Sequence, residues 1–334
     1  MDELVPRVLQ GEIRALARVC RFIDDQRAGY RDLLGQLFPH AGAAWVVGIT
    51  GSPGAGKSTL TDALVANFRA RGWRVGVVAI DPTSPFTGGA FLGDRIRLQR
   101  HFEDPQVFIR SLATRGALGG LSRTTQDTVV AVAAWQADVV LVETVGVGQD
   151  EVDVAQASDT TCVVLAPGMG DDIQATKAGI LEAADIFVVN KADRDGADAT
   201  VRDLETMLAL GALRPVPVSF GGHAALVGLS REAEAGWVPP ILRSVATHGA
   251  GIVELAAAIA RHREHAAQSG EERARRRRRH ELMLRTMLYE RWLAVFSRGL
   301  DGELARVLDR IGAGELDPYS ALEELSHRFP PLGT

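Results

Sequence analysis

The chain has 334 residues, of which 46% are hydrophobic and 24% are charged, and its formal net charge is −5. This composition is typical of a folded globular protein. The negative net charge makes nucleic acid a poor candidate partner. Its two cysteines, Cys20 and Cys162, lack the spacing of a metal site or a disulfide framework. Apolar runs stay below the roughly 20 residues that span a bilayer, so we expect a cytoplasmic protein with no membrane partner.

The first 42 residues are expected to form a helical extension. Apolar residues recur there near the helical period, which predicts two amphipathic helices: Leu4, Val8, Ile13, Leu16 and Val19 mark the first, and Leu33, Leu34, Leu37 and Phe38 mark the second. Pro39 and Gly42 end this extension, since both residues interrupt helices.

Residues 43–268 predict a single α/β domain. Seven short runs rich in Val and Ile predict strands, mostly separated by helical segments: 45–50, 74–80, 106–110, 138–142, 161–166, 186–190 and 241–244. Because these runs contain few alternating polar residues, they favour a parallel sheet covered on both faces. The expected fold is a doubly wound, mostly parallel P-loop NTPase sheet.

The composition changes after Gly270, and residues 269–334 predict a C-terminal helical arm. A charged helix is expected over 271–296, followed by short helices over 302–311 and 318–329. The arginine run Arg275 to Arg279 has two interpretations. It forms either a solvated helix face, partly paired with glutamates (Glu271, Glu272 and Glu281), or a docking surface for an acidic partner.

A phosphate-binding motif lies between the first predicted strand of the α/β domain and the helix that follows it. Its residues are Gly51, Ser52, Pro53, Gly54, Ala55, Gly56, Lys57, Ser58 and Thr59. The glycines let backbone N–H groups approach a polyphosphate at a helix N-terminus. Lys57 supplies a cation near the β and γ phosphates, and the hydroxyl of Ser58 is placed to reach magnesium.

A base-recognition element follows the strand expected at 186–190. Asn190, Lys191 and Asp193 match the Asn-Lys-x-Asp pattern of GTPases, at a strand end where ligands of open α/β sheets bind. The Asp193 carboxylate can accept hydrogen bonds from the ring N–H and the amine of guanine, whereas adenine offers neither donor there. Ser244, Val245 and Ala246 follow another strand, and they form either a second base contact through backbone donors or a plain strand-end turn.

Three carboxylates are expected near the phosphates, at Asp81, Asp94 and Glu143. Magnesium beside a triphosphate takes one or two carboxylates and keeps several waters, so which of the three binds directly stays open. Val147 follows the turn Glu143-Thr144-Val145-Gly146, at the place where Ras-like enzymes carry the glutamine that orients water. We therefore expect slow intrinsic hydrolysis of GTP to GDP.

Six segments together resemble the MeaB/ArgK/MMAA family of G3E GTPases over nearly the whole chain. They are 51–59, 81–84, 93–97, 113–116, 143–149 and 167–172. The resemblance implies a homodimer, formed through the C-terminal arm, that acts as a chaperone. Its client would be an adenosylcobalamin-dependent acyl-CoA mutase such as methylmalonyl-CoA mutase, with GTP hydrolysis gating delivery of intact cofactor and exchange of the damaged form.

The resemblance also implies roles for individual residues. Asp81, Asp94 and Glu143 would be the magnesium-side carboxylates, and residues 168–177 would form a third switch. Lys177 would take part in partner-stimulated hydrolysis and join Lys57 and Glu143 as a catalytic candidate. Composition alone would make Lys177 an ordinary exposed helix residue.

Three other functions compete with this interpretation. An ATP-dependent protein kinase is disfavoured by the Asn190 to Asp193 element. A GTP-dependent metallochaperone usually has clustered Cys or His ligands, whereas the histidines here are scattered. The nearest pair, His262 and His265, is expected at the surface. A nucleotide-binding module without turnover is the third alternative.

Overall fold

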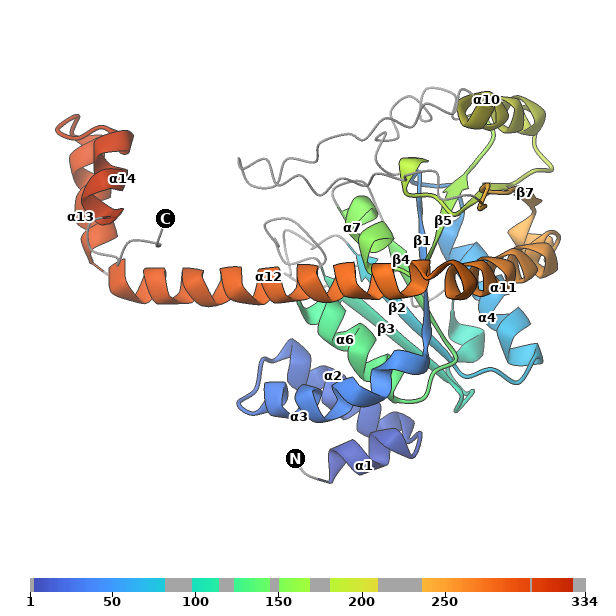
Figure 1. The fold of residues 1–334 in the computed structure, drawn as a ribbon, viewed down its shortest axis with the longest axis horizontal. Coiled ribbons are helices and arrows are strands. Elements are labelled where there is room, and N and C mark those ends of the chain that lie inside the picture. The colour runs from blue at the N-terminus through green and yellow to red at the C-terminus, as the bar shows by residue number, and fades with distance from the viewer. Residues whose placement is uncertain are drawn as a thin grey trace. The chain divides into compact units, whose positions relative to one another are not determined.

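The computed structural model describes residues 3–81, 98–113, 123–144, 150–168, 181–209, 236–300 and 302–326. Within them, seven parallel strands form one sheet in the order β3-β2-β4-β1-β5-β6-β7 (Figure 1). The strands are β1 (Trp45–Gly51), β2 (Val75–Asp81), β3 (Val107–Ala113), β4 (Val139–Thr144), β5 (Thr160–Leu165), β6 (Ile186–Asn190) and β7 (Ile241–Ser244). The predicted fold class is confirmed, and each predicted strand overlaps an observed one.

Helices cover both faces of the sheet, because strand side chains point alternately to opposite faces. Val46 and Val47, neighbours on β1, belong to different hydrophobic clusters. One face packs against α4 (Lys57–Ala70) and α11 (Ile252–Ser269). The other packs against α6 (Arg123–Ala134), α7 (Asp150–Ala157) and α10 (Ala197–Ala209). This double covering buries the Val-rich strands and fixes their carboxyl ends along one edge.

The N-terminal segment forms three α-helices, so the prediction of two was wrong. They are α1 (Leu4–Leu9), α2 (Ile13–Asp24) and α3 (Tyr30–Leu37), followed by the 3-10 helix η1 (Phe38–Ala43). The first predicted helix is interrupted at Gly11, whose φ of 82° lies outside the helical region. The apolar residues keep the same helical period on both sides of Gly11, so the pattern alone does not show the break.

These N-terminal helices share a hydrophobic cluster with α6 and the sheet. Polar contacts reinforce the packing. Asp24 of α2 forms an ion pair with Arg110 of β3, and Arg123 Nη2 of α6 donates to Tyr30 Oη at 2.5 Å. The N-terminal helices are therefore part of the main core.

The C-terminal helices are α12 (Glu271–Leu300), α13 (Glu303–Gly312) and α14 (Pro318–Ser326). By internal contacts the chain divides into two compact units, Met1–Glu281 and Leu282–Thr334, with the boundary inside α12. In the second unit Val307 and Ala321 are buried, and Arg310 of α13 pairs with Glu324 of α14 at 2.9 Å. None of the helices in the described ranges is both long enough and apolar enough to cross a membrane.

Candidate nucleotide-binding site

The loop between β1 and α4 is packed too closely for side chains at two of its glycines. Gly51 has a φ of 124°, and a Cβ there would lie 2.1 Å from the Val164 carbonyl oxygen of β5. Gly56 has a φ of 93°, and a Cβ there would lie 2.5 Å from Asn190 Nδ2 of β6. Both positions therefore require glycine. The loop ends at the N-terminus of α4, where free N–H groups and the helix dipole favour an anion.

Lys57 opens α4 and is held at the phosphate loop. Its side chain is buried, and Nζ donates to the carbonyl oxygens of Gly51 at 2.6 Å and Ser52 at 3.1 Å. A buried ammonium group requires such acceptors, because desolvation of the charge is costly. The cation is thus positioned where the sequence predicted a triphosphate.

Ser58 and Glu143 lie together beside this loop. Ser58 Oγ donates to Glu143 Oε1 at 2.6 Å, and Glu143 is 1% exposed. The register of β1 with β4 pairs Ile49 with Glu143, which brings the carboxylate next to the phosphate-loop strand. A hydroxyl and a carboxylate are the hard oxygen donors that magnesium prefers.

The remaining magnesium and catalytic candidates are only partly placed. Asp81 ends β2, and its neighbour Ile80 is in register with Thr144 of β4. The backbones of Asp81 and Glu143 therefore lie at the carboxyl ends of adjacent strands. Asp94 and Lys177 lie outside the described residues.

Asn190 joins the phosphate loop to the second predicted base contact. Its Nδ2 donates to the Ala55 carbonyl oxygen at 2.8 Å. Its Oδ1 accepts from Ser244 Oγ and from the Ala246 backbone N–H, each at 3.1 Å. The side chain is 2% exposed. Asn190 therefore braces both loops, a structural role that the sequence motif did not reveal.

Lys191 and Asp193 follow Asn190 directly after β6. Lys191 adopts a φ of 57°, and its Nζ donates to the Gly54 carbonyl oxygen at 2.6 Å. The Ala192 N–H donates to the Ser244 carbonyl oxygen at 3.0 Å. Asp193 is exposed, and within the described ranges nothing forms a hydrogen bond or ion pair with its carboxylate. This carboxylate is therefore available to a ligand.

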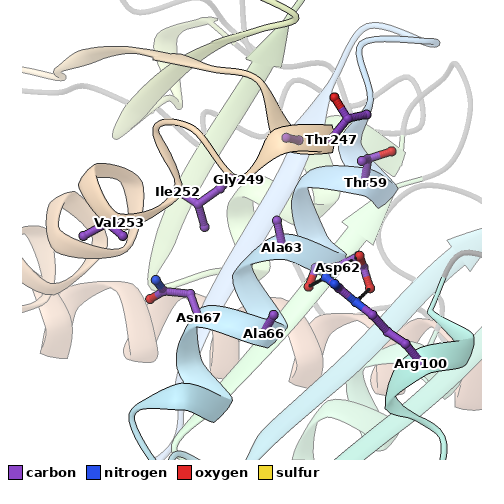
Figure 2. Close-up of a pocket in the computed structure, with 11 residues that line it drawn as sticks. Thr59, Asp62, Ala63, Ala66, Asn67, Arg100, Thr247, Gly249, Ile252 and Val253 are labelled. Atoms are coloured by element: carbon purple, nitrogen blue, oxygen red, sulfur yellow. Dashed lines mark hydrogen bonds and ion pairs between the residues drawn. The ribbon is translucent and has the colours of Figure 1, made fainter.

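A groove of about 510 Å³ lies between α4 and the segment that leads into α11 (Figure 2). Two predicted nucleotide contacts, Thr59 and Ala246, line it. Asp62 forms part of its wall and pairs with Arg100, which belongs to the 3-10 helix η2 (Gln99–His101). Sequence analysis missed Asp62 and Arg100, because they come from separate elements that only the fold brings together.

The family model described as Methylmalonyl Co-A mutase-associated GTPase MeaB matches residues 14–299. The chain belongs to this family. A putative GTPase of Pyrococcus abyssi is 45% identical over 324 residues, covering 97% of this chain and 95% of the relative. The mouse protein named methylmalonic aciduria type A homolog, mitochondrial, is 30% identical over 345 residues. This match covers 98% of this chain and 79% of the mouse protein.

Among solved structures, the crystal structure of an LAO/AO transport system kinase matches with a TM-score of 0.69 and 27% identity. The match covers 98% of this chain and 96% of that one. These relationships confirm the predicted MeaB resemblance and the predicted membership of a GTPase family. In this MeaB-family protein, the loop between β1 and α4 and the Asn190 segment are joined by hydrogen bonds into one unit.

Replacement of Lys57 by alanine is expected to weaken GTP binding on the order of 100-fold. The change removes a buried charge that would otherwise pair with phosphate, a loss that costs about 2–5 kcal/mol. Titration with a fluorescent GTP analogue measures the effect. Arg71→Ala, at an exposed position after the same helix, is the control. Unchanged affinity in Lys57→Ala would contradict the assignment.

Proposed function

We propose that the protein uses GTP binding and hydrolysis to gate cofactor loading, protection or reactivation of an adenosylcobalamin-dependent acyl-CoA mutase. Methylmalonyl-CoA mutase or a close relative would be the client. The family description names this mutase, and the mouse relative is named for methylmalonic aciduria. The observation that carries the proposal is the Asn190 side chain, which links the phosphate loop to the base loop in a MeaB-family chain.

The phosphates and the guanine base of GTP each have matching groups in the proposed site. Lys57 and the N-terminus of α4 would balance the phosphate charge. Asp193 would accept from the ring N–H and the amine of guanine. Backbone groups of Ser244, Val245 and Ala246 would contact the guanine oxygen, and Asn190 holds that loop in place.

Magnesium fits the oxygen donors that the site provides. Ser58 and Glu143 would hold the ion, since the buried Glu143 carboxylate already contacts the Ser58 hydroxyl. Asp81 and Asp94 are the other proposed magnesium-side carboxylates. Bound magnesium would neutralise charge on the β and γ phosphates. Lys57, Glu143 and Lys177 are the proposed catalytic residues.

The proposed compartment is the cytoplasm. Cys20 and Cys162 are both free and buried. Burial raises the pKa of the Cys20 thiol to about 12 and also raises the pKa of the Cys162 thiol. Neither thiol is therefore reactive at neutral pH, which suits the reducing compartment that we propose.

A homodimer through the arm, residues 269–334, is also proposed. Leu284, Leu288 and Trp292 of α12 are exposed by 60%, 56% and 43%, and they recur every four residues. This spacing places them along one stripe of the helix. Contiguous exposed apolar side chains of this kind mark protein interfaces. A second copy of the chain, with its own stripe, supplies a matching apolar surface.

Replacement of Asp193 by asparagine is expected to shift base preference from guanine to xanthine. Xanthine carries a carbonyl in place of the guanine amine, and the asparagine amide would donate to it while still accepting from the ring N–H. Competition of GTP, XTP and ATP against a fluorescent guanine nucleotide measures the preference. Asp195→Asn, at an exposed position in the same turn, is the control.

Two outcomes of that competition would contradict the base assignment. Unchanged guanine preference in Asp193→Asn would show that this carboxylate does not contact the base. Preference of the unmodified protein for ATP would support the kinase alternative instead, because the proposed site leaves the Asp193 charge unpaired against adenine.

The proposed client is tested by adding methylmalonyl-CoA mutase to the protein. Phosphate release from GTP is expected to rise when the mutase is added. In a second experiment, the protein is expected to pull the mutase down from the native extract when a non-hydrolysable GTP analogue is present. Lys57→Ala is the control for nucleotide dependence. If GTP yields no phosphate either with or without the mutase, the protein is a binding module. If phosphate is released but the mutase has no effect on it, the client assignment is wrong.

The double substitution Leu284→Glu and Leu288→Glu is expected to produce monomers, because two charges would have to be buried in the apolar interface. Sedimentation equilibrium measures the mass of the assembly. Arg273→Glu, an exposed charge change at the start of the same helix, is expected to leave the dimer intact. A dimer that survives the double substitution would place the interface elsewhere.

A further inference from the structure

A buried polar network joins the amino ends of three adjacent strands, at the edge of the sheet opposite the nucleotide loops. Trp45 Nε1 of β1 donates to Thr160 Oγ1 of β5 at 2.8 Å. Two buried carboxylates accept backbone N–H groups. Asp159 accepts from Val46 at 2.9 Å, and Asp185 accepts from Thr161 at 2.8 Å. Asp159 and Asp185 are 0% and 1% exposed, so their charges need partners inside the protein.

Two arginines of the run at the start of α12 supply those partners. Arg275 binds Asp185 through both Nη atoms at 2.7 Å each. Arg279 Nη2 donates to Asp159 Oδ1 at 3.0 Å, and its Nη1 donates to the Ala157 carbonyl oxygen at 2.8 Å. The two arginines are four residues apart and therefore lie on one face of the helix.

The rest of the arginine run behaves differently. Arg277 and Arg278 are exposed, and Arg276 pairs with Glu272 at 2.8 Å. The predicted solvated, partly paired face thus holds for these residues. The prediction is wrong for Arg279 and incomplete for Arg275, which pairs with Glu271 as well as with Asp185. The buried aspartates lie 90 positions from Arg275 and 120 positions from Arg279 in the sequence, so they leave no local signal.

Helix α11 contributes to the same network through His262. Its Nδ1 lies 2.8 Å from Thr160 Oγ1, and its Nε2 lies 3.4 Å from Asp185 Oδ1. The side chain is 0% exposed, so the prediction of a surface histidine was wrong. Trp237 packs edge-on against the His262 ring, with centroids 4.9 Å apart, and donates to the Asp185 carbonyl oxygen at 2.9 Å.

Asp185, His262 and Glu271 place possible metal-ligand atoms within 4.8 Å of one another. Arg275 nevertheless holds the position between the two carboxylates, because its Nη2 donates to both Asp185 and Glu271. Burial raises the pKa of Asp185, but the charges of Arg275 and His262 and the hydrogen bonds to the carboxylate outweigh burial and lower it overall. The Arg275 guanidinium group therefore already balances negative charge of the two carboxylates in this cluster.

The network connects the start of α12 to three strands, two of which, β1 and β6, end at the proposed nucleotide site. In the sheet β1, β5 and β6 are neighbours. At its carboxyl end β1 leads into the phosphate loop, and β6 ends at Asn190. Strands packed on both faces are rigid elements of the kind that can carry coupling between two sites.

We propose that Arg275 and Arg279 are positioning residues that anchor the first turns of α12 to these strands, and that the anchored state binds guanine nucleotide more tightly than the released state. Coupling of this kind is reciprocal. A partner that pulls α12 away from Asp185 and Asp159 would weaken nucleotide binding, and bound nucleotide would oppose the release by the same factor.

The test compares four single substitutions in the full chain. Arg275→Met and Arg279→Met remove anchors, whereas Arg277→Met and Arg278→Met remove the same charge from exposed positions of the run. GDP affinity is expected to fall about tenfold in each anchor variant, within the range typical of coupling between sites. It is expected to stay unchanged in both controls. Hydrogen exchange of the segment Thr160–Leu165 reports release of the network, since the Thr161 N–H is bound to Asp185.

Arg275→Ala with added methylguanidinium separates positioning from general destabilisation. The free cation is expected to restore GDP affinity in this variant and to leave Arg278→Ala unaffected. Should the Arg275 variants fail to fold, Arg279→Met and Arg279→Lys still provide the comparison, with Lys retaining the charge but losing the paired hydrogen bonds to Asp159 and the Ala157 carbonyl oxygen. Faster exchange of the strand with unchanged GDP affinity would overturn the proposal, as would equal losses in anchor and control variants.

Discussion

The close packing of the phosphate loop against its neighbours is the constraint on which the site depends. The loop backbone lies against the carbonyl group of Val164 on one side and the amide of Asn190 on the other, with no room for a Cβ at Gly51 or Gly56. Because those neighbours belong to β5 and β6, the sheet order β1-β5-β6 is itself a requirement of the loop. The phosphate-binding and base-binding segments are consequently one packed unit rather than two independent motifs.

Much of the fold could be predicted because the strands have a simple physical requirement. A parallel strand covered on both faces is apolar along nearly its whole length, and the run at 186–190 matches the fully buried strand β6 at both ends. The position of the loop between β1 and α4 was equally predictable, since its glycines, Lys57 and Ser58 lie within one short segment. The break at Gly11 could not be predicted in this way, because one glycine divides the segment into two helices without changing the period of the apolar residues.

Contacts between distant residues could not be predicted in the same way. The motif identified Asn190, but its hydrogen bonds to Ala55 and Ala246 depend on where β1 and β7 lie relative to β6. In the sequence His262 looks like an ordinary histidine of a helix. Its burial follows from contacts with Thr160 and Asp185, which are distant in the sequence. For such residues, burial and pairing are decided by the sheet order, which no local pattern contains.

Helix α12 changes chemical character along its length, and the two parts suit different tasks. Its first turns bind buried carboxylates through arginines, an arrangement that is directional and strongly dependent on geometry. From Leu284 onward it presents apolar side chains, whose association is not directional and scales with the area removed from water. Attachment that depends on geometry is therefore concentrated at Arg275 and Arg279, within the unit that contains the proposed nucleotide site, whereas the contact area of the proposed dimer would come from the later residues.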